Sequence, residues 1–259
     1  MIARNAGAIM SDSQTIETPQ GRTLAYHLTE GRGPCVVFLG GLKSDMEGTK
    51  ALFLEDWARK EGRAFLRFDY SGHGQSSGTF EQGCIGDWAE DTAAAVASLT
   101  SGPIVPVGSS MGGWQALLLA RAQPDIIAGL VTIAAAPDFT EDGWWAGFTG
   151  DQKRELKDEG QVALPSDYME PYIVTQRMIE DGRNQLVLRT PLDLPFPVRF
   201  LQGTADTAVS VATAVQLLDH ATGPDMQLKL VKDADHRFSD GPCLGLIVDA
   251  LDEVLAISD

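Results

Sequence analysis

Ser110 lies in a sequence context in which a serine can act as a nucleophile. It is the central residue of 108–112, which reads Gly-Ser-Ser-Met-Gly, a G-x-S-x-G pattern. The β-branched run before it predicts a strand, and the alanine- and leucine-rich run after it predicts a helix. On such a turn the hydroxyl is exposed on a sharp bend, and the two glycines leave room where strand and helix nearly touch. We therefore expect Ser110 to be a catalytic nucleophile.

A second G-x-S-x-G match in the chain serves as an internal control. Residues 74–78 read Gly-Gln-Ser-Ser-Gly, with Ser76 in the central position. They follow a polar turn and lead into Thr-Phe-Glu-Gln-Gly, with no strand directly before and no helix directly after. Because the pattern needs its structural context, we interpret Ser76 as a loop residue.

A serine hydroxyl needs a neighbouring base, and that base needs an acid to hold its tautomer. Of the four histidines, His236 comes just after the last predicted strand, at the same carboxyl edge of the sheet as Ser110. His73 stands in a Gly-His-Gly turn that suits a structural role, His220 closes a surface helix, and His27 lies within an edge strand. The sequence therefore predicts His236 as the base.

The predicted acid is Asp206. It follows the predicted strand 198–201 and so lies at the same edge of the sheet. Asp233 and Asp235 are close to the histidine in sequence, and we interpret them as companions within its loop. The resulting order of nucleophile, acid and base along the chain is Ser110, Asp206 and then His236.

Acyl transfer places negative charge on the former carbonyl oxygen, which two backbone N–H groups must stabilise. One donor is expected at Met111, directly after the nucleophile. The other is expected in the loop after the strand that ends at Leu39, where Leu42 is the first choice and Gly41 its nearest competitor.

Composition narrows the class of protein. The chain has 259 residues, 44% of them hydrophobic, which fits one large α/β domain or one domain with an insertion. A formal charge of −16 disfavours nucleic acid and anionic membranes as partners. Three cysteines without C-x-x-C spacing indicate neither a disulfide framework nor a zinc site, and no spacing implies a metal or an organic cofactor. No secretory signal and no membrane span is predicted, so we expect an acidic cytoplasmic protein.

Periodicity predicts an α/β fold. An antiparallel hairpin at 15–17 and 23–29 is followed by alternating strands and helices, the pattern of a mostly parallel sheet with helices on both faces. We expect the core to comprise residues 14–136 and 196–259, and residues 1–13 to be disordered. The predicted strands are 35–39, 64–68, 103–108, 126–135, 198–201 and 227–231, and the predicted helices are 47–61, 84–99, the run after Ser110, 210–220 and 242–257.

Residues 137–195 interrupt this alternation and are expected to form a helical cap insertion. Two helix-like runs, 151–159 and 172–181, lie within it. Its aromatic residues line a substrate pocket or form the cap's own core, and its cations hold an anionic leaving group or form a solvated face. The aromatic candidates for the pocket are Trp144, Trp145, Phe148, Tyr168 and Tyr172, and the cations are Lys153, Arg154, Lys157, Arg177 and Arg183.

Taken together, these motifs resemble the α/β-hydrolase superfamily from about residue 15 onward. The likeness rests on Leu-Gly-Gly-Leu at 39–42, Arg-Phe-Asp-Tyr-Ser-Gly-His-Gly at 67–74, Gly-Ser-Ser-Met-Gly-Gly-Trp at 108–114, Gln-Gly-Thr-Ala-Asp at 202–206 and Asp-His at 235–236. With Gly-Thr-Lys-Ala at 48–51, the second and third segments more narrowly resemble mitochondrial palmitoyl-protein thioesterases that also act as acyl-glucuronide esterases. The chain departs from this resemblance at two points. Its N-terminus lacks a mitochondrial presequence, and Gly40-Gly41 stands where the superfamily commonly has His-Gly before the oxyanion loop.

The resemblance implies a serine hydrolase that cleaves esters or thioesters, acting on a small molecule or an acylated protein. Alternatives with the same fold are a short-chain carboxylesterase or lactonase, carbon–carbon bond hydrolysis, perhydrolysis, and a binding protein without catalysis. Haloalkane dehalogenase chemistry is excluded, because it needs a carboxylate where Ser110 stands.

Overall fold

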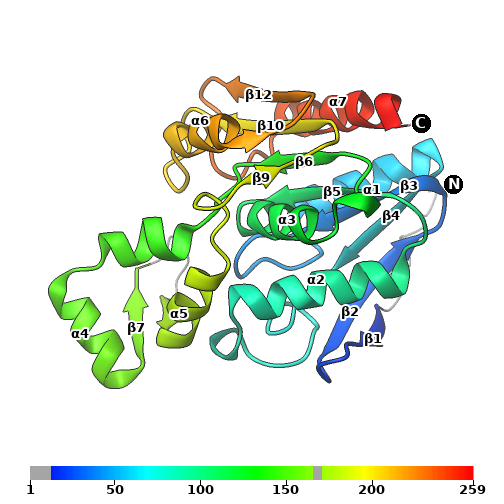
Figure 1. The fold of residues 1–259 in the computed structure, drawn as a ribbon. Helices are drawn as coiled ribbons and strands as arrows, with labels where there is room; N and C mark the ends of the chain where they lie inside the picture. The colour runs from blue at the N-terminus through cyan, green and yellow to red at the C-terminus, as the bar shows by residue number, and fades with distance from the viewer. Residues whose placement is uncertain (1–12, 166–170, 259) are drawn as a thin grey trace, which may run out of the picture.

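The chain folds around one eight-stranded sheet (Figure 1). The computed structural model describes residues 13–165 and 171–258. The strand order is β1-β2-β4-β3-β5-β6-β10-β12, in which β1–β2 and β2–β4 are antiparallel and the other pairs parallel. This confirms a mostly parallel sheet with an N-terminal antiparallel hairpin. The expected disordered lead-in lies outside the described residues, apart from Ser13.

The sheet and its helices follow the expected order along the chain. Central strands such as β5 are buried at every position, which explains their continuous apolar sequence, whereas β12 at the edge alternates in exposure. The strands are β1 (Gln14–Glu17), β2 (Thr23–Thr29), β3 (Arg32–Leu39), β4 (Arg63–Phe68), β5 (Ile104–Ser109), β6 (Leu130–Ile133), β10 (Val198–Gly203) and β12 (Met226–Val231), and the helices are α1 (Thr49–Glu61), α2 (Ile85–Leu99), α3 (Met111–Ala122), α6 (Val211–His220) and α7 (Gly241–Ser258).

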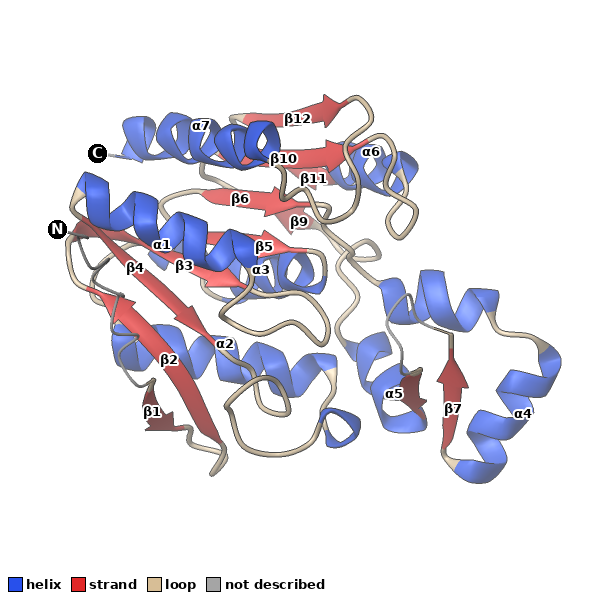
Figure 2. Cartoon of the chain, turned by 180° about the vertical axis from the view of Figure 1, so that it is seen from behind, coloured by secondary structure: helices blue, strands red, loops and turns tan. Residues whose placement is uncertain are grey.

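Helices cover both faces of the sheet. Helices α2, α3 and α6 pack on one face, and α1 and α7 pack on the other, where Figure 2 shows them in front of the strands. Each face has its own apolar core. Trp88 and Trp114 are fully buried on the first face, and Phe65 and Ile247 are fully buried on the second.

Residues 137–195 form a mixed rather than a purely helical segment. They contain a π-helix η3 (Thr140–Trp145), α4 (Gly150–Glu159), α5 (Gln176–Asn184) and two antiparallel strands, β7 (Gln161–Leu164) and β8 (Tyr172–Thr175). The helix predicted over 172–181 is therefore wrong in its first turn. Its Tyr-Ile-Val-Thr run, made of one aromatic and three β-branched residues, pairs with β7, and the Thr175 hydroxyl then caps α5 by accepting the Met178 N–H.

Shorter elements also differ from expectation. The strand predicted over 126–135 narrows to β6, because Pro124 starts a 3₁₀ turn, η2 (Pro124–Ile126). A second 3₁₀ turn, η1 (Phe80–Gln82), and a two-residue pairing between β9 (Leu192–Asp193) and β11 (Ala221–Thr222) were not expected.

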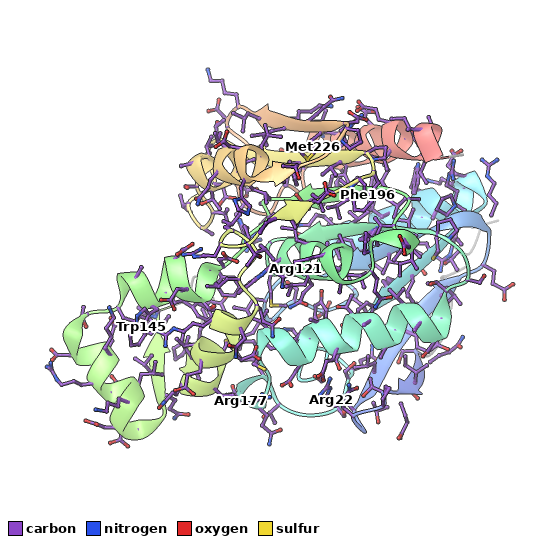
Figure 3. The ribbon with its side chains drawn as sticks, in the orientation of Figure 1. Arg22, Arg121, Trp145, Arg177, Phe196 and Met226 are labelled. Carbon is purple, nitrogen blue, oxygen red and sulfur yellow. The ribbon has the colours of Figure 1, made fainter. Side chains whose placement is uncertain are left out.

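The 137–195 segment lies beside the edge at which the parallel strands end (Figures 1 and 2). Arg177 pairs with both carboxylate oxygens of Asp87 on α2, at 2.6 and 2.9 Å, and Figure 3 shows it between α5 and α2. The indole N–H of Trp114 on α3 donates to the Gln185 carbonyl at 3.1 Å. Fully buried Asp138 accepts N–H groups of the returning chain, at Val187 and Leu188. These contacts fix the segment over the carboxyl edge of the sheet.

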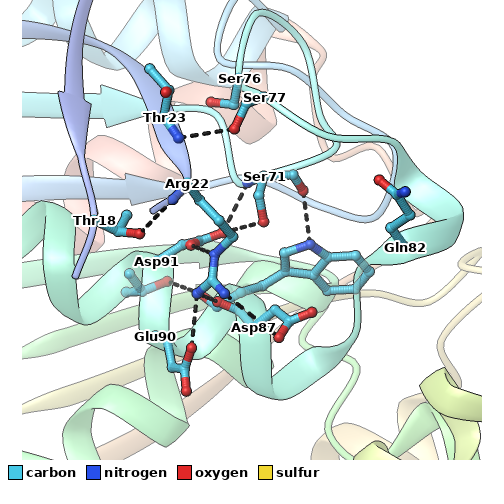
Figure 4. A network of polar contacts seen from close by, with 12 residues as sticks. Thr18, Arg22, Thr23, Ser71, Ser76, Ser77, Gln82, Asp87, Glu90 and Asp91 are labelled. Carbon is cyan, nitrogen blue, oxygen red and sulfur yellow. Dashed lines mark hydrogen bonds and ion pairs between the residues drawn. The ribbon is translucent and has the colours of Figure 1, made fainter. Parts of the chain in front are cut away.

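Ser76, the serine of the second G-x-S-x-G match, belongs to a structural loop. Its hydroxyl donates to the Asp69 carbonyl at 2.6 Å and accepts the Ala25 N–H at 2.9 Å. The neighbouring Ser77 accepts the Thr23 N–H at 2.9 Å, within a polar network that joins this loop to the first hairpin (Figure 4).

His73 is buried among aromatic rings in the same loop. Its ring lies edge-on to those of Tyr70, Phe80 and Trp88, with centroids 5.1 to 5.6 Å away, and its Nδ1 is 3.2 Å from the Ser71 carbonyl. Burial lowers the pKa of His73 to about 4. The unfolded chain therefore takes up a proton at this histidine at a higher pH than the native protein does.

This difference predicts a pH-dependent stability that His73→Asn removes. A histidine with a pKa of about 6.5 unfolded and about 4 folded costs the native state about 2 kcal/mol between pH 7 and pH 5. The free energy of unfolding, measured with urea at both pH values, should fall by that much more in the wild type than in the variant. Equal falls in the two proteins would contradict a buried neutral His73.

Candidate active site

Ser110 occupies a strained position between β5 and α3. Its φ of 56° and ψ of −118° are sparsely populated for a residue with a side chain. A Cβ added at Gly108 would lie 2.3 Å from the Gly112 carbonyl oxygen, and one at Gly112 would lie 2.0 Å from the Leu39 oxygen. The Ser110 N–H donates to the Ile133 carbonyl at 2.9 Å. This tight packing holds the serine at the end of the strand with its side chain facing a cavity.

The structure brings the three predicted catalytic residues into contact. Ser110 follows β5, Asp206 follows β10 and His236 follows β12, so all three lie at the carboxyl edge of the sheet. His236 Nε2 is 3.1 Å from Ser110 Oγ, and His236 Nδ1 is 2.8 Å from Asp206 Oδ2. With the proton on Nδ1, which donates to the carboxylate, Nε2 is free to accept the serine proton.

Asp206 is held as a carboxylate in a buried position. Its Oδ2 accepts the Gln202 side-chain amide at 2.9 Å, and its Oδ1 accepts the N–H groups of Ala208 and Val209, both at 2.8 Å. Burial alone would raise the pKa of Asp206, but the hydrogen bonds from His236, Val209 and Gln202 outweigh it and lower the pKa. Asp206 is therefore ionised at neutral pH.

Gln202 also helps to hold Asp206, and the sequence analysis did not identify this role. Its side chain is 1% exposed at the end of β10, and its amide nitrogen also donates to the Val209 carbonyl at 3.0 Å. A second polar side chain, besides Arg199, within this buried strand is the signal that could have indicated a polar partner nearby.

The two expected oxyanion donors flank the serine. Strands β3 and β5 pair with Leu39 opposite Gly108, so the loop after β3 lies next to the serine turn. The N–H groups of Leu42 and Met111 have no acceptor among the described residues, and both residues line the cavity around Ser110. Their role as oxyanion donors stays a prediction.

The loop that carries Leu42 is anchored at both ends. The Tyr70 hydroxyl donates to the Gly40 carbonyl at 3.4 Å, and Asp69 accepts the Met46 N–H at 2.7 Å. Arg67 donates to the Met46 carbonyl at 3.1 Å. The Arg-Phe-Asp-Tyr stretch at 67–70 thus supports the loop rather than lining the cavity itself.

A cavity of about 530 Å³ opens at Ser110 and His236. Of the predicted aromatic residues, Trp144 and Tyr172 line it and Trp145 and Phe148 do not, while Tyr168 lies outside the described residues. Phe148 is buried in the small apolar core of the 137–195 segment, and the Trp145 ring lies between Lys153 and Arg183, away from the cavity (Figure 3). Adjacent residues of a helix point in different directions, so Trp144 and Trp145 cannot share one face. The other apolar lining residues include Leu42, Met111, Ala136, Phe139 and Val209.

The five cations predicted for an anionic leaving group lie outside this cavity. Arg177 pairs with Asp87, and Lys153, Arg154, Lys157 and Arg183 line a second cavity of about 400 Å³ within the 137–195 segment. The cations that do line the first cavity are Lys50 and Arg237, which sequence reasoning did not single out.

The described residues contain neither a cluster of metal ligands nor a membrane-spanning helix. Residues 13–165 and 171–258 contain no group of three or more side chains placed to hold a metal ion. Within the same ranges, no helix is long and apolar enough to cross a membrane.

Comparison with known proteins assigns the chain to a family. The sequence profile of the alpha/beta hydrolase fold matches residues 34–168. The chain is 34% identical over 245 residues to the mitochondrial palmitoyl-protein thioesterase ABHD10 of Bos taurus, covering 93% of this chain and 79% of the relative. It is 33% identical over 242 residues to the Homo sapiens protein of that name, with the same coverage.

Solved structures support the same assignment. A provisionally assigned hydrolase of Agrobacterium vitis S4 superposes with a TM-score of 0.91 at 36% identity, covering 96% of this chain and 99% of that one. The mouse alpha/beta hydrolase domain-containing protein 10 superposes with a TM-score of 0.87 at 29% identity, covering 95% and 99%. With its relatives, its sheet and its serine turn in agreement, this chain belongs to the alpha/beta hydrolase fold family.

Proposed function

We propose that this chain is a serine hydrolase that cleaves carboxylic esters or thioesters through an acyl-Ser110 intermediate. The observation that carries the proposal is the unbroken hydrogen-bonded chain from Asp206 through His236 to Ser110, which ends in an open cavity. A binding protein without catalysis has no need of this alignment, so the arrangement favours an enzyme.

The proposed acylation step uses each of these residues. His236 Nε2 takes the proton of Ser110 as Oγ attacks the carbonyl carbon, and the electron pair of the double bond moves to the carbonyl oxygen. The N–H groups of Leu42 and Met111 stabilise that oxyanion. Asp206 stabilises the imidazolium, which then protonates the departing alcohol or thiol.

Deacylation follows the same steps, with water in place of the Ser110 hydroxyl as the nucleophile. His236 removes a proton from the water as its oxygen attacks the acyl carbonyl, and when the tetrahedral intermediate collapses, His236 gives that proton to the departing Ser110 Oγ. The products are a carboxylic acid and a free enzyme. No step needs a metal or an organic cofactor.

The proposed substrate carries an apolar acyl group. Met111, Phe139 and Trp144 give the cavity an apolar wall, and the relatives at 33–34% identity are named palmitoyl-protein thioesterases. A short-chain ester or a lactone is the alternative, because the same residues perform the same chemistry on it. The cytoplasmic location stays a prediction beside relatives named as mitochondrial, and the division into a core (14–136 and 196–259) and a cap (137–195) is likewise proposed.

Ser110→Ala should remove the activity while Ser76→Ala retains it. Loss of the nucleophile should lower kcat for p-nitrophenyl butyrate by at least about 10⁴-fold, because the remaining groups form no acyl intermediate. Ser76 is the matched control, since it has the same sequence pattern but only structural hydrogen bonds. Initial rates on both folded variants provide the measurement, and turnover by Ser110→Ala at near the wild-type rate would contradict the mechanism.

Trp144→Ala should weaken the use of long acyl chains more than that of short ones. Trp144 lines the cavity and its neighbour Trp145 does not, so Trp145→Ala is the matched control. We expect kcat/KM for a palmitoyl thioester to fall about tenfold in Trp144→Ala, which corresponds to about 1.4 kcal/mol of lost apolar contact. The value for an acetyl thioester should stay within about twofold in both variants. Equal losses for both substrates would place the acyl group elsewhere.

A further inference from the structure

Lys50 is a half-buried cation at the edge of the catalytic cavity, and the mechanism above gives it no role. It is the second residue of α1, and its side chain lines the cavity that contains Ser110 and His236. Its ammonium has no carboxylate within 4.0 Å among the described residues. Partial burial of a charge without an ion-pair partner has a cost, so its position calls for an explanation.

The Lys50 ammonium contacts the loop that carries His236. It donates to the Arg237 carbonyl at 2.5 Å and lies 3.4 Å from the Ser239 hydroxyl. The Ser239 hydroxyl donates to the same carbonyl at 2.8 Å. The residue that immediately follows His236 is therefore held at its carbonyl from a helix nearly 190 residues earlier in the chain.

This loop needs such support, because its backbone is strained on both sides of the histidine. Asp233 has a φ of 61° and Phe238 a φ of 50°, and neither is a glycine. Before His236, the loop is tied to the loop after β10, where Thr204 accepts the Asp233 N–H at 2.9 Å and the Ala205 N–H donates to Ala234. After His236, Phe238 is fully buried and the Lys50 contact holds the carbonyl of the intervening residue.

Lys50 also lies on the helix that follows the predicted oxyanion loop. Residues 40–42 lead into α1 through a segment that is anchored at Met46. The ammonium thus connects the element that presents Leu42 to the loop that presents His236. A bond between these two elements keeps the base and the oxyanion donor at a fixed spacing around Ser110.

We infer that Lys50 is a positioning residue that holds the His236 loop through the Arg237 carbonyl and so keeps His236 within reach of Ser110. The inference rests on the proposed function, because it assigns Lys50 to the same site. Lys50 acts through the loop and needs no contact with the substrate.

The protonation state of Lys50 makes this role measurable as a pH dependence of kcat. Burial lowers the pKa of Lys50 to about 8; Asp235, which raises it, and Arg237, which lowers it further, are the charged groups that face it. Below pH 8 the ammonium makes a charge-assisted hydrogen bond, and above it the neutral amine makes a weaker one. The wild-type kcat should therefore fall as the pH rises through about 8.

The test compares Lys50→Met, Lys50→Arg and, as the matched control, Lys60→Met. Lys60 lies on the same helix with a 70% exposed side chain that pairs with Asp56. With p-nitrophenyl butyrate from pH 6 to 10, Lys50→Met should lower kcat about 10- to 100-fold with KM within about twofold, because a misplaced base slows the chemical step. Lys50→Arg should restore kcat to within about fivefold and move the alkaline fall to higher pH, because guanidinium stays protonated. Lys60→Met should match the wild type.

The results that would contradict the role of Lys50 can be distinguished from the result that would contradict the proposed function. A raised KM with unchanged kcat in Lys50→Met would overturn the inference in favour of direct substrate binding, and wild-type kinetics would overturn it altogether. If Lys50→Met does not fold, an alkaline fall at the same pH in Lys50→Arg and the wild type contradicts the inference. A folded wild type without any turnover contradicts the proposed function itself, and the role of Lys50 falls with it.

Discussion

The site depends on the close approach of β5, α3 and the end of β3 at Ser110. A serine at a φ of 56° is stable only because the glycines around it let strand and helix nearly touch, with Gly112 against the Leu39 carbonyl. The same contact brings the loop after β3 beside the serine hydroxyl. One steric constraint thus places both the proposed nucleophile and the N–H groups that would receive the oxyanion.

Although the chain has a net charge of −16, cations as well as a carboxylate lie around this turn. Asp206 is buried and ionised under four hydrogen bonds, while Lys50 and Arg237 are the cations that line the cavity. In the proposed mechanism the carboxylate stabilises a cationic His236, and the Lys50 ammonium holds the loop that carries this histidine. Asp206 contacts the ring of His236, and Lys50 contacts the backbone of the residue after it. The proposed base is therefore positioned through both its side chain and its loop.

The sheet and the contact between the three residues followed from the sequence because their signals are local. Buried strands are continuous apolar runs, and parallel strands bring the residues after them to one edge. The 137–195 segment was harder to predict, because Trp144 and Trp145 are equivalent by composition and differ only in the face of the helix from which they project. Gln202 and Lys50 lie within the segments 202–206 and 48–51, but the resemblance gave neither a role. Gln202 bonds to Asp206 and Val209 in the loop that follows it, and Lys50 bonds to Arg237 far along the chain. Such contacts become visible only when the fold is known.

The most direct test of the central claim is covalent labelling by a fluorophosphonate, detected as intact mass and mapped by peptide, in the wild type and Ser110→Ala. An activated Ser110 should give one adduct at that serine, and the variant should give none. A folded wild type that stays unlabelled, or that is labelled at another residue, would contradict a catalytic role for Ser110 and favour a hydrolase-fold protein that binds without catalysis.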